Sequence, residues 1–284
     1  MLTTVSSASK EVIIGNGRPV VLIGERINPT GKKMLSESLI KGSMEIVRKE
    51  ALAQVQAGAD IIDVNVVAFG VDETILLPQA VQAVMESVES PICLDSTKTA
   101  AIAAALKVYK GKPIINSVTG EEHSLNTVLP IVKEYGASVI GLVQDDDGIP
   151  KDAERRVEIA RKIVDRAEAM GISRDNILID CMAFAIGAEP GSAKDVFSAI
   201  ERIRKELGVN IVLAASNISF GLPERGLLNN AFMTMAIASG ATCLIVDVAK
   251  ARPAVLAAEL ILGTDKYARR YIQAYRQSQK GREK

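Results

Sequence analysis

The chain has 284 residues, 48% of them hydrophobic, and its 34 Lys and Arg residues equal its 34 Asp and Glu residues in number. This balance gives no reason to expect nucleic acid or an anionic membrane as the main partner. The single histidine, His123, makes a His-based zinc site or a Ser-His-Asp triad close to excluded. No apolar run reaches the ~18 residues of a membrane helix, and the N-terminus lacks a secretion-signal pattern, so we expect a cytoplasmic protein.

The N-terminal region predicts a hairpin. We expect residues 1–10 to be frayed. Asn16-Gly17 is a strong two-residue turn signal between the apolar runs 11–15 and 20–25, and the predicted hairpin would cap the bottom of the fold that follows.

Short runs rich in Val, Ile and Leu recur through the rest of the chain, separated by segments with helical periodicity. Near-continuous apolar strands are typical of a parallel sheet covered on both faces. Several helical segments end in glycine, which can close a helix in the left-handed conformation. Eight strand–helix units predict an α/β fold, a (β/α)8 TIM barrel, in one domain spanning residues 1–284. The alternative is an open doubly wound sheet, but no G-x-G-x-x-G turn follows any strand. The eight runs are 20–25, 60–66, 91–96, 113–118, 138–143, 176–181, 210–215 and 243–248.

Residues 264–284 predict a final helix and a charged tail. The three cysteines, Cys93, Cys181 and Cys243, lie inside apolar runs, and their odd number and wide spacing indicate small buried hydrophobes rather than disulfides or a zinc knuckle.

Polar side chains follow the strands, on the face where such barrels carry their chemistry. The run "PICLDSTK" (91–98) is the clearest case, because a carboxylate at the end of an apolar strand needs a partner. Asp145-Asp146-Asp147 is typical of a solvated turn, and Glu25 and Arg26 suggest a local ion pair. The residues at or just after the strand ends are Glu25, Asn28, Asp63, Asn65, Asp95, Asn116, Gln144, Asp180, Ser216, Asn217 and Asp247.

This inventory of carboxylates and carboxamides constrains the ligand. A ring N–H beside an exocyclic amine, as in guanine or a pterin, can donate two charge-assisted hydrogen bonds to one carboxylate. A divalent metal with oxygen ligands is the rival interpretation, although we predict no metal site. Asp63 and Asn65 could instead cap a helix or brace a loop, and Asp247 could pair with Lys250 or Arg252.

Seven motifs in register carry a resemblance. The chain resembles the pterin-binding methyltransferase family, and in particular methyltetrahydrofolate:corrinoid protein methyltransferases and the folate domain of cobalamin-dependent methionine synthase. The resemblance covers roughly residues 20–262 and implies the same barrel. The motifs are "LIGERIN" (22–28), "DVNV" (63–66), "CLDST" (93–97), "IINS" (114–117), "GIPKD" (148–152), "LIDC" (178–181) and "ASNIS" (215–219).

The resemblance implies residue roles. Asp95, Asn116 and Asp180 match positions that hydrogen-bond the pterin ring, and Asn217 matches a catalytic Asn near the nitrogen that carries the methyl group. Ser216, Arg225 and Asn65 fall in pocket positions of less defined role. Some family members carry a polar side chain where this sequence has Phe220, which cannot hydrogen-bond a pterin.

The resemblance also implies an activity and partners. The expected enzyme moves a methyl group between tetrahydrofolate (or methyltetrahydrofolate) and the cobalt of a corrinoid (cobalamin) held by a separate protein, and forms a homodimer. His123 does not fit the D-x-H-x-x-G corrinoid-binding motif, so we expect the corrinoid protein to dock over the barrel mouth, with Met182, Phe184, Ile186 and residues 220–224 as candidate contacts. The alternatives are a dihydropteroate synthase-like enzyme, whose strand-end motifs differ from "SNIS" and "VDVAKARP", and a non-catalytic folate-binding protein.

Overall fold

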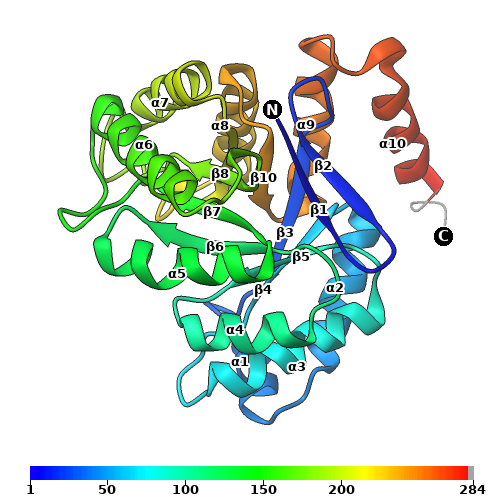
Figure 1. The fold of residues 1–284 in the computed structure, drawn as a ribbon. Helices are drawn as coiled ribbons and strands as arrows, with labels where there is room; N and C mark the ends of the chain where they lie inside the picture. The colour runs from blue at the N-terminus through cyan, green and yellow to red at the C-terminus, as the bar shows by residue number, and fades with distance from the viewer. Residues whose placement is uncertain (281–284) are drawn as a thin grey trace.

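The computed structural model describes residues 1–280 and confirms the closed eight-stranded parallel barrel with surrounding helices (Figure 1). The barrel strands neighbour one another in chain order, and the last strand closes onto the first. Every strand thus directs its carboxyl end toward the same rim. The barrel strands are β3 (Val21–Ile27), β4 (Ile61–Asn65), β5 (Ile92–Asp95), β6 (Ile114–Thr119), β7 (Ser138–Leu142), β8 (Ile177–Asp180), β9 (Asn210–Ala214) and β10 (Cys243–Val246).

Helices connect the strands and cover the outside of the barrel (Figure 1). Gly58, Gly136 and Gly208 end three of them at positive φ, as the sequence pattern predicts. The helices are α1 (Lys33–Ile40), α2 (Glu45–Ala57), α3 (Glu73–Ser87), α4 (Thr99–Val108), α5 (Glu122–Tyr135), α6 (Ala153–Ala169), α7 (Ser192–Leu207), α8 (Arg225–Ser239), α9 (Val248–Ile261) and α10 (Arg269–Lys280), with short 3-10 helices η1 (Arg174–Asn176), η2 (Ala215–Ser219) and η3 (Lys266–Ala268).

The barrel interior changes character along the strands. Side chains in a strand alternate between its two faces, so every second residue points inward. The lower inward positions are apolar and form one buried cluster. On three strands the inward positions nearer the rim are polar, namely Asp63 and Asn65 on β4, Asp95 on β5 and Asp180 on β8, whereas Leu142 on β7 and Ala214 on β9 are apolar. The cluster within the barrel contains Val21, Ile23, Ile61, Cys93, Ile114, Ile140, Leu178, Val212, Cys243 and Ile245.

The N-terminal hairpin exists, but its strands differ from the prediction. β2 (Glu11–Gly15) pairs antiparallel with β1 (Leu2–Ser6), so residues 1–10 are not frayed, and Asn16-Gly17 joins the hairpin to the barrel instead of closing it. β3 cannot pair with β2 because both of its edges are taken by β10 and β4. Val5, Val12 and Ile14 pack against the lower interior cluster, so the hairpin caps that end of the barrel as expected.

The C-terminal helix lies beside α9 (Figure 1). Its first turn is anchored by Asp265, which accepts from the backbone N–H groups of Arg270 and Tyr271, and by an ion pair between Arg270 and the buried Glu259 of α9. The predicted tail beyond residue 280 lies outside the described residues. Over residues 1–280, no helix combines the length and apolar character needed to cross a bilayer.

Candidate functional site

Three predicted residues lie side by side on neighbouring strands at the rim. The register places Asn65 opposite Asp95, and Asp95 opposite Asn116. The partner that Asp95 needs is Asn65, whose Nδ2 donates to Asp95 Oδ2 at 2.9 Å. Asn65 Oδ1 accepts from the N–H of Val67 at 2.9 Å. Asn65 therefore braces the following loop and also fixes the orientation of the Asp95 carboxylate.

A second carboxyl, Asp63, lies one interior layer below this row. It is buried, and its Oδ1 has no hydrogen-bond partner among residues 1–280. Burial, followed by the nearby charge of Asp95, raises the pKa of Asp63 well above its ordinary value, against lowering contributions from Cys93 and Asn116. Burial also raises the pKa of Asp95, which Asn65 opposes. Asp63 is thus an interior group of the barrel and not a helix cap.

Asp180 lies further round the barrel, with only 4% of its surface exposed. Its two oxygens accept from backbone N–H groups: Oδ1 from Met182 at 2.7 Å and Oδ2 from Ala214 at 3.1 Å. Burial raises its pKa to about 6, although these hydrogen bonds and the charge of Arg156 act in the opposite direction. At neutral pH the carboxylate is therefore mostly ionised, in a fixed orientation, with lone pairs left for a ligand.

The remaining predicted residues, Ser216, Asn217 and Arg225, line a cavity of about 610 Å³ beside the ends of β3, β9 and β10. Arg225 donates from Nη2 to the carbonyl of Ser216 at 2.9 Å, which ties the start of α8 to η2. Phe220 is 72% exposed at the cavity wall, 6.0 Å from the guanidinium of Arg225. The cavity lining does not include Asn65, Asp95, Asn116 or Asp180. The structure thus places the predicted residues in two groups around one rim.

Glu25 faces the same cavity, where Ser216 Oγ donates to it at 3.4 Å, and burial raises its pKa. The predicted Glu25–Arg26 pair is wrong. Arg26 extends outward from the strand to Glu50, at 3.3 Å, and to Asp247, at 3.8 Å.

Asp247 also pairs with Lys250 at 3.0 Å, which was one of its two predicted structural partners. Lys32, which sequence reasoning missed, lies in the cavity lining, where its Nζ donates to the carbonyl of Arg26 at 2.7 Å. Basic residues on this side of the rim offer contacts for an anionic part of a ligand.

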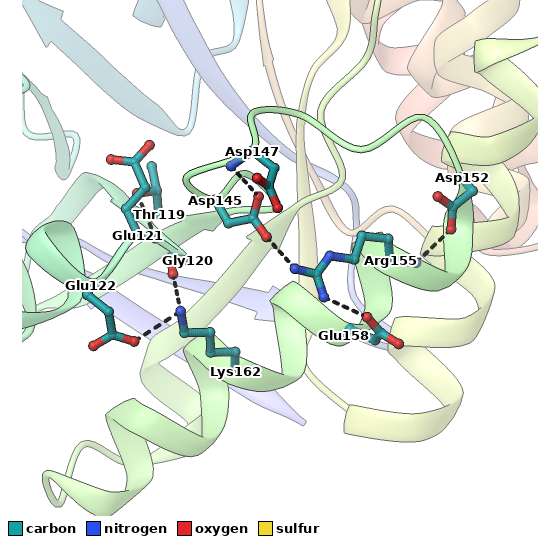
Figure 2. Close-up of polar contacts among 10 residues, drawn as sticks. All are labelled: Thr119, Gly120, Glu121, Glu122, Asp145, Asp147, Asp152, Arg155, Glu158 and Lys162. Carbon is teal, nitrogen blue, oxygen red and sulfur yellow. Dashed lines mark hydrogen bonds and ion pairs between the residues drawn. The ribbon is translucent and has the colours of Figure 1, made fainter.

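The loops after β6 and β7 are fixed by α6, as Figure 2 shows. Arg155 pairs with Asp145 at 2.8 Å, and Lys162 donates to the carbonyl of Gly120 at 2.7 Å and pairs with Glu122 at 3.0 Å. Asp145 is buried, so the interpretation of 145–147 as a solvated turn holds only for its two later residues. This edge of the rim is therefore held rigidly from outside the barrel.

The predicted docking loops differ in exposure. Met182 and Ile186 are half-buried and pack against the core, and Phe184 lies beneath the guanidinium of Arg156 at 5.7 Å. Phe220, by contrast, is open to solvent. The loop after β4 carries Phe69, which is 98% exposed and which sequence reasoning missed.

Comparison with known sequences gives consistent matches. A profile described as pterin binding enzyme matches residues 24–247. The methylcorrinoid:tetrahydrofolate methyltransferase of Eubacterium limosum is 31% identical over 270 residues, which cover 92% of this chain and 98% of that protein. The methionine synthase of Mycobacterium tuberculosis is 32% identical over 263 residues, which are 88% of this chain but only 22% of that protein.

Comparison with solved structures shows the same fold. A Yersinia pestis DHPS with a pterine-sulfa conjugate superposes with a TM-score of 0.71 at 17% identity, covering 91% of this chain and 98% of that one. A Xanthomonas albilineans dihydropteroate synthase with 4-aminobenzoic acid gives 0.69 at 21% identity, covering 92% and 98%. At such identities the likeness concerns the barrel and not the reaction.

Proposed function

Because the chain belongs to the family of pterin binding enzymes, we propose that it transfers a methyl group between N5 of tetrahydrofolate and the cobalt of a corrinoid carried by a separate protein. The observation that carries this proposal is the similarity to the methylcorrinoid:tetrahydrofolate methyltransferase, which extends over nearly the whole of both chains. The dihydropteroate synthases share the fold at much lower identity.

In this proposal the polar row binds the pterin headgroup. Asp95 and Asp180 present acceptors at the carboxyl ends of β5 and β8, and Asn116 presents an amide from β6 opposite Asp95. The ring N–H and the 2-amino group of a pterin can donate together to one ionised carboxylate. The fixed hydrogen bonds of Asp180 and Asp95 support this role, because a carboxylate that is already oriented loses little freedom on binding.

Asn217 is the proposed catalytic residue. It is exposed on η2 and lines the cavity beside Ser216. The folate nitrogen leaves more readily when it is protonated, and it attacks a methyl group only when it is unprotonated. An amide can donate to or accept from that nitrogen, or a water on it, and so favour either state. The remaining task of the protein is to hold the pterin in one orientation toward the incoming methyl carrier.

The corrinoid would supply a Co(I) centre that serves as nucleophile in one direction and as leaving group in the other, and we propose that a partner protein brings it to the mouth. Within this chain the single histidine, His123, lies exposed at the start of α5, followed by "SLNTV". Exposed Phe69 and Phe220 lie on rim loops that such a partner can contact. A homodimer and a cytoplasmic location stay predictions, and the proposal covers transfer in either direction.

The test is a methyl-transfer assay with tetrahydrofolate and methylcobalamin, and with methyltetrahydrofolate and reduced cobalamin, followed by corrinoid absorbance. We expect Asn217→Ala to lower the rate more than tetrahydrofolate affinity, and Asp180→Ala chiefly to lower that affinity in calorimetry. Asp175→Ala is the matched control, because Asp175 is exposed at the opposite end of β8. Transfer in neither direction together with no binding of tetrahydrofolate would refute the proposal, and dihydropteroate formation from 4-aminobenzoate would favour the synthase alternative.

A further inference from the structure

Helix α6 contacts three consecutive rim loops through three basic residues. Lys162 holds the loop after β6, and Arg155 holds the loop after β7 (Figure 2). Arg156 faces the other way, into the protein, and reaches the loop after β8. The first two contacts lie near the surface, whereas the third is buried.

Arg156 is 0% exposed, which is unusual for an arginine. Its Nε donates to the carbonyl of Pro150 at 2.9 Å, and its Nη1 donates to the carbonyls of Cys181 at 3.0 Å and Met182 at 3.1 Å. Its Nη2 has no partner within the described part of the chain. Burying a guanidinium costs desolvation free energy unless its N–H groups are hydrogen-bonded. The groups that accept from Arg156 therefore indicate what it holds in place.

Two of the residues that it holds, Cys181 and Met182, directly follow β8. Met182 has a φ of +52°, a left-handed conformation that a side chain with a Cβ adopts only when its surroundings impose it. In this conformation its N–H points back to Asp180 Oδ1, at 2.7 Å. Arg156 thus fixes the carbonyl of the peptide unit that carries this N–H, which is that of Cys181, and the carbonyl of the next unit, which is that of Met182.

We infer that Arg156 is a positioning residue for pterin binding, which acts by holding the backbone of Cys181 and Met182 so that the Met182 N–H orients the carboxylate of Asp180. This inference rests on the proposed function, in which Asp180 binds the headgroup. Arg156 is too deeply buried to contact the ligand itself.

The inference predicts a pH signature. An ionised Asp180 accepts the pterin N–H groups, so affinity falls as the pH drops through the pKa of Asp180, which is about 6. The charge of Arg156 lowers the pKa of Asp180, and the Cys181 thiol and the carboxylates of Asp195 and Asp152 act on the pKa of Arg156 in turn. Removing its charge raises the pKa of Asp180 further and moves the midpoint of binding to higher pH.

The experiment measures tetrahydrofolate binding by calorimetry from pH 5.5 to 8 in Arg156→Met, Arg156→Lys and, as the matched control, Arg155→Met. We expect Arg156→Met to weaken binding at least 10-fold at pH 7 and to raise the midpoint, Arg156→Lys to lie between it and the wild type, and Arg155→Met to match the wild type. Circular dichroism and thermal unfolding identify folded variants. Arg156→Lys keeps the charge and the apolar stem, so it decides the question if Arg156→Met does not fold.

A second comparison places Arg156→Lys in an Asp180→Asn background. If Arg156 acts through Asp180, the substitution there changes the affinity less than twofold. An undiminished effect, or folded Arg156 variants with the affinity and midpoint of the wild type, would overturn the inference. A wild-type protein that binds no tetrahydrofolate would instead refute the proposed function.

Discussion

The substitution Asp180→Asn tests the electrostatics of the rim directly. Burial raises the pKa of this carboxyl to about 6, from an ordinary value of 3.8. The folded state therefore binds the proton more tightly than the unfolded state. The contribution of Asp180 to stability is most favourable below the unfolded pKa and decreases as the pH rises to about 6. At ~1.4 kcal/mol for each pH unit, the whole decrease is roughly 3 kcal/mol.

The asparagine variant is neutral at every pH, so it escapes this decrease. Between pH 5 and pH 7 the wild type should lose roughly 1.3 kcal/mol of unfolding free energy that the variant keeps. A pH-independent cost opposes the gain, because one amide oxygen cannot accept from both Met182 and Ala214. An N–H left unsatisfied costs about 1–3 kcal/mol. The difference in unfolding free energy between variant and wild type at a single pH is therefore uninformative. The change of that difference with pH is what tests the reasoning.

The assay is urea unfolding of both proteins at pH 5, 6 and 7, with Asp175→Asn as the control, because Asp175 is exposed on η1 just before the same strand. Other titrating groups contribute equally to the variant and the wild type, so their effects cancel in the difference. We expect the difference for Asp180→Asn to increase steadily in favour of the variant, and the difference for the control to stay constant. A constant difference for Asp180→Asn would show that the buried carboxyl titrates normally and would refute the reasoning.

Three further predictions follow from buried contacts. Asn65→Ala removes the donor to Asp95, and we expect about 10-fold weaker tetrahydrofolate binding in calorimetry, since a hydrogen bond to a charged group contributes ~1.5–3 kcal/mol; unchanged affinity would contradict the role of this pair. Arg270→Met leaves the carboxylate of Glu259, 1% exposed, without its cation, and we expect a loss of roughly 3 kcal/mol in urea unfolding and faster amide exchange in α10; wild-type stability would argue against this anchor. The three cysteines are buried, with thiol pKa values raised by burial, so a thiol reagent should react with the native protein only at the rate of unfolding; rapid labelling of the folded protein would disprove their burial.

The sequence predicts the barrel well because the signals are local and repeated. Each strand is a short Val/Ile/Leu run, and the polar residues that follow it, such as Asp95 and Asp180, are read directly from the strand end. The hairpin shows where local signals fail. Asn16-Gly17 is a good turn, but the competition for β3 by its two barrel neighbours decides which strands pair.

Side-chain partners are harder to predict than strand ends. Arg26 follows Glu25 in sequence, yet the strand turns the two to opposite faces, so Arg26 meets Glu50 and Asp247 instead. Arg156 looks like one more charge on a solvated helix. The only sequence signal that it points inward is its spacing, which puts it on the same face of α6 as the apolar residues Ala160 and Ile163.

The hairpin at the closed end of the barrel offers a practical handle. Its connecting turn, 7–10, exposes Ala8 and Ser9, and the strands on either side insert Val5, Val12 and Ile14 into the barrel floor. A fluorophore, affinity tag or solid support attached at this turn would be rigidly linked to the protein yet remote from the rim. The immobilised protein would then present the rim of the barrel to solution, which suits experiments that capture binding partners on a surface.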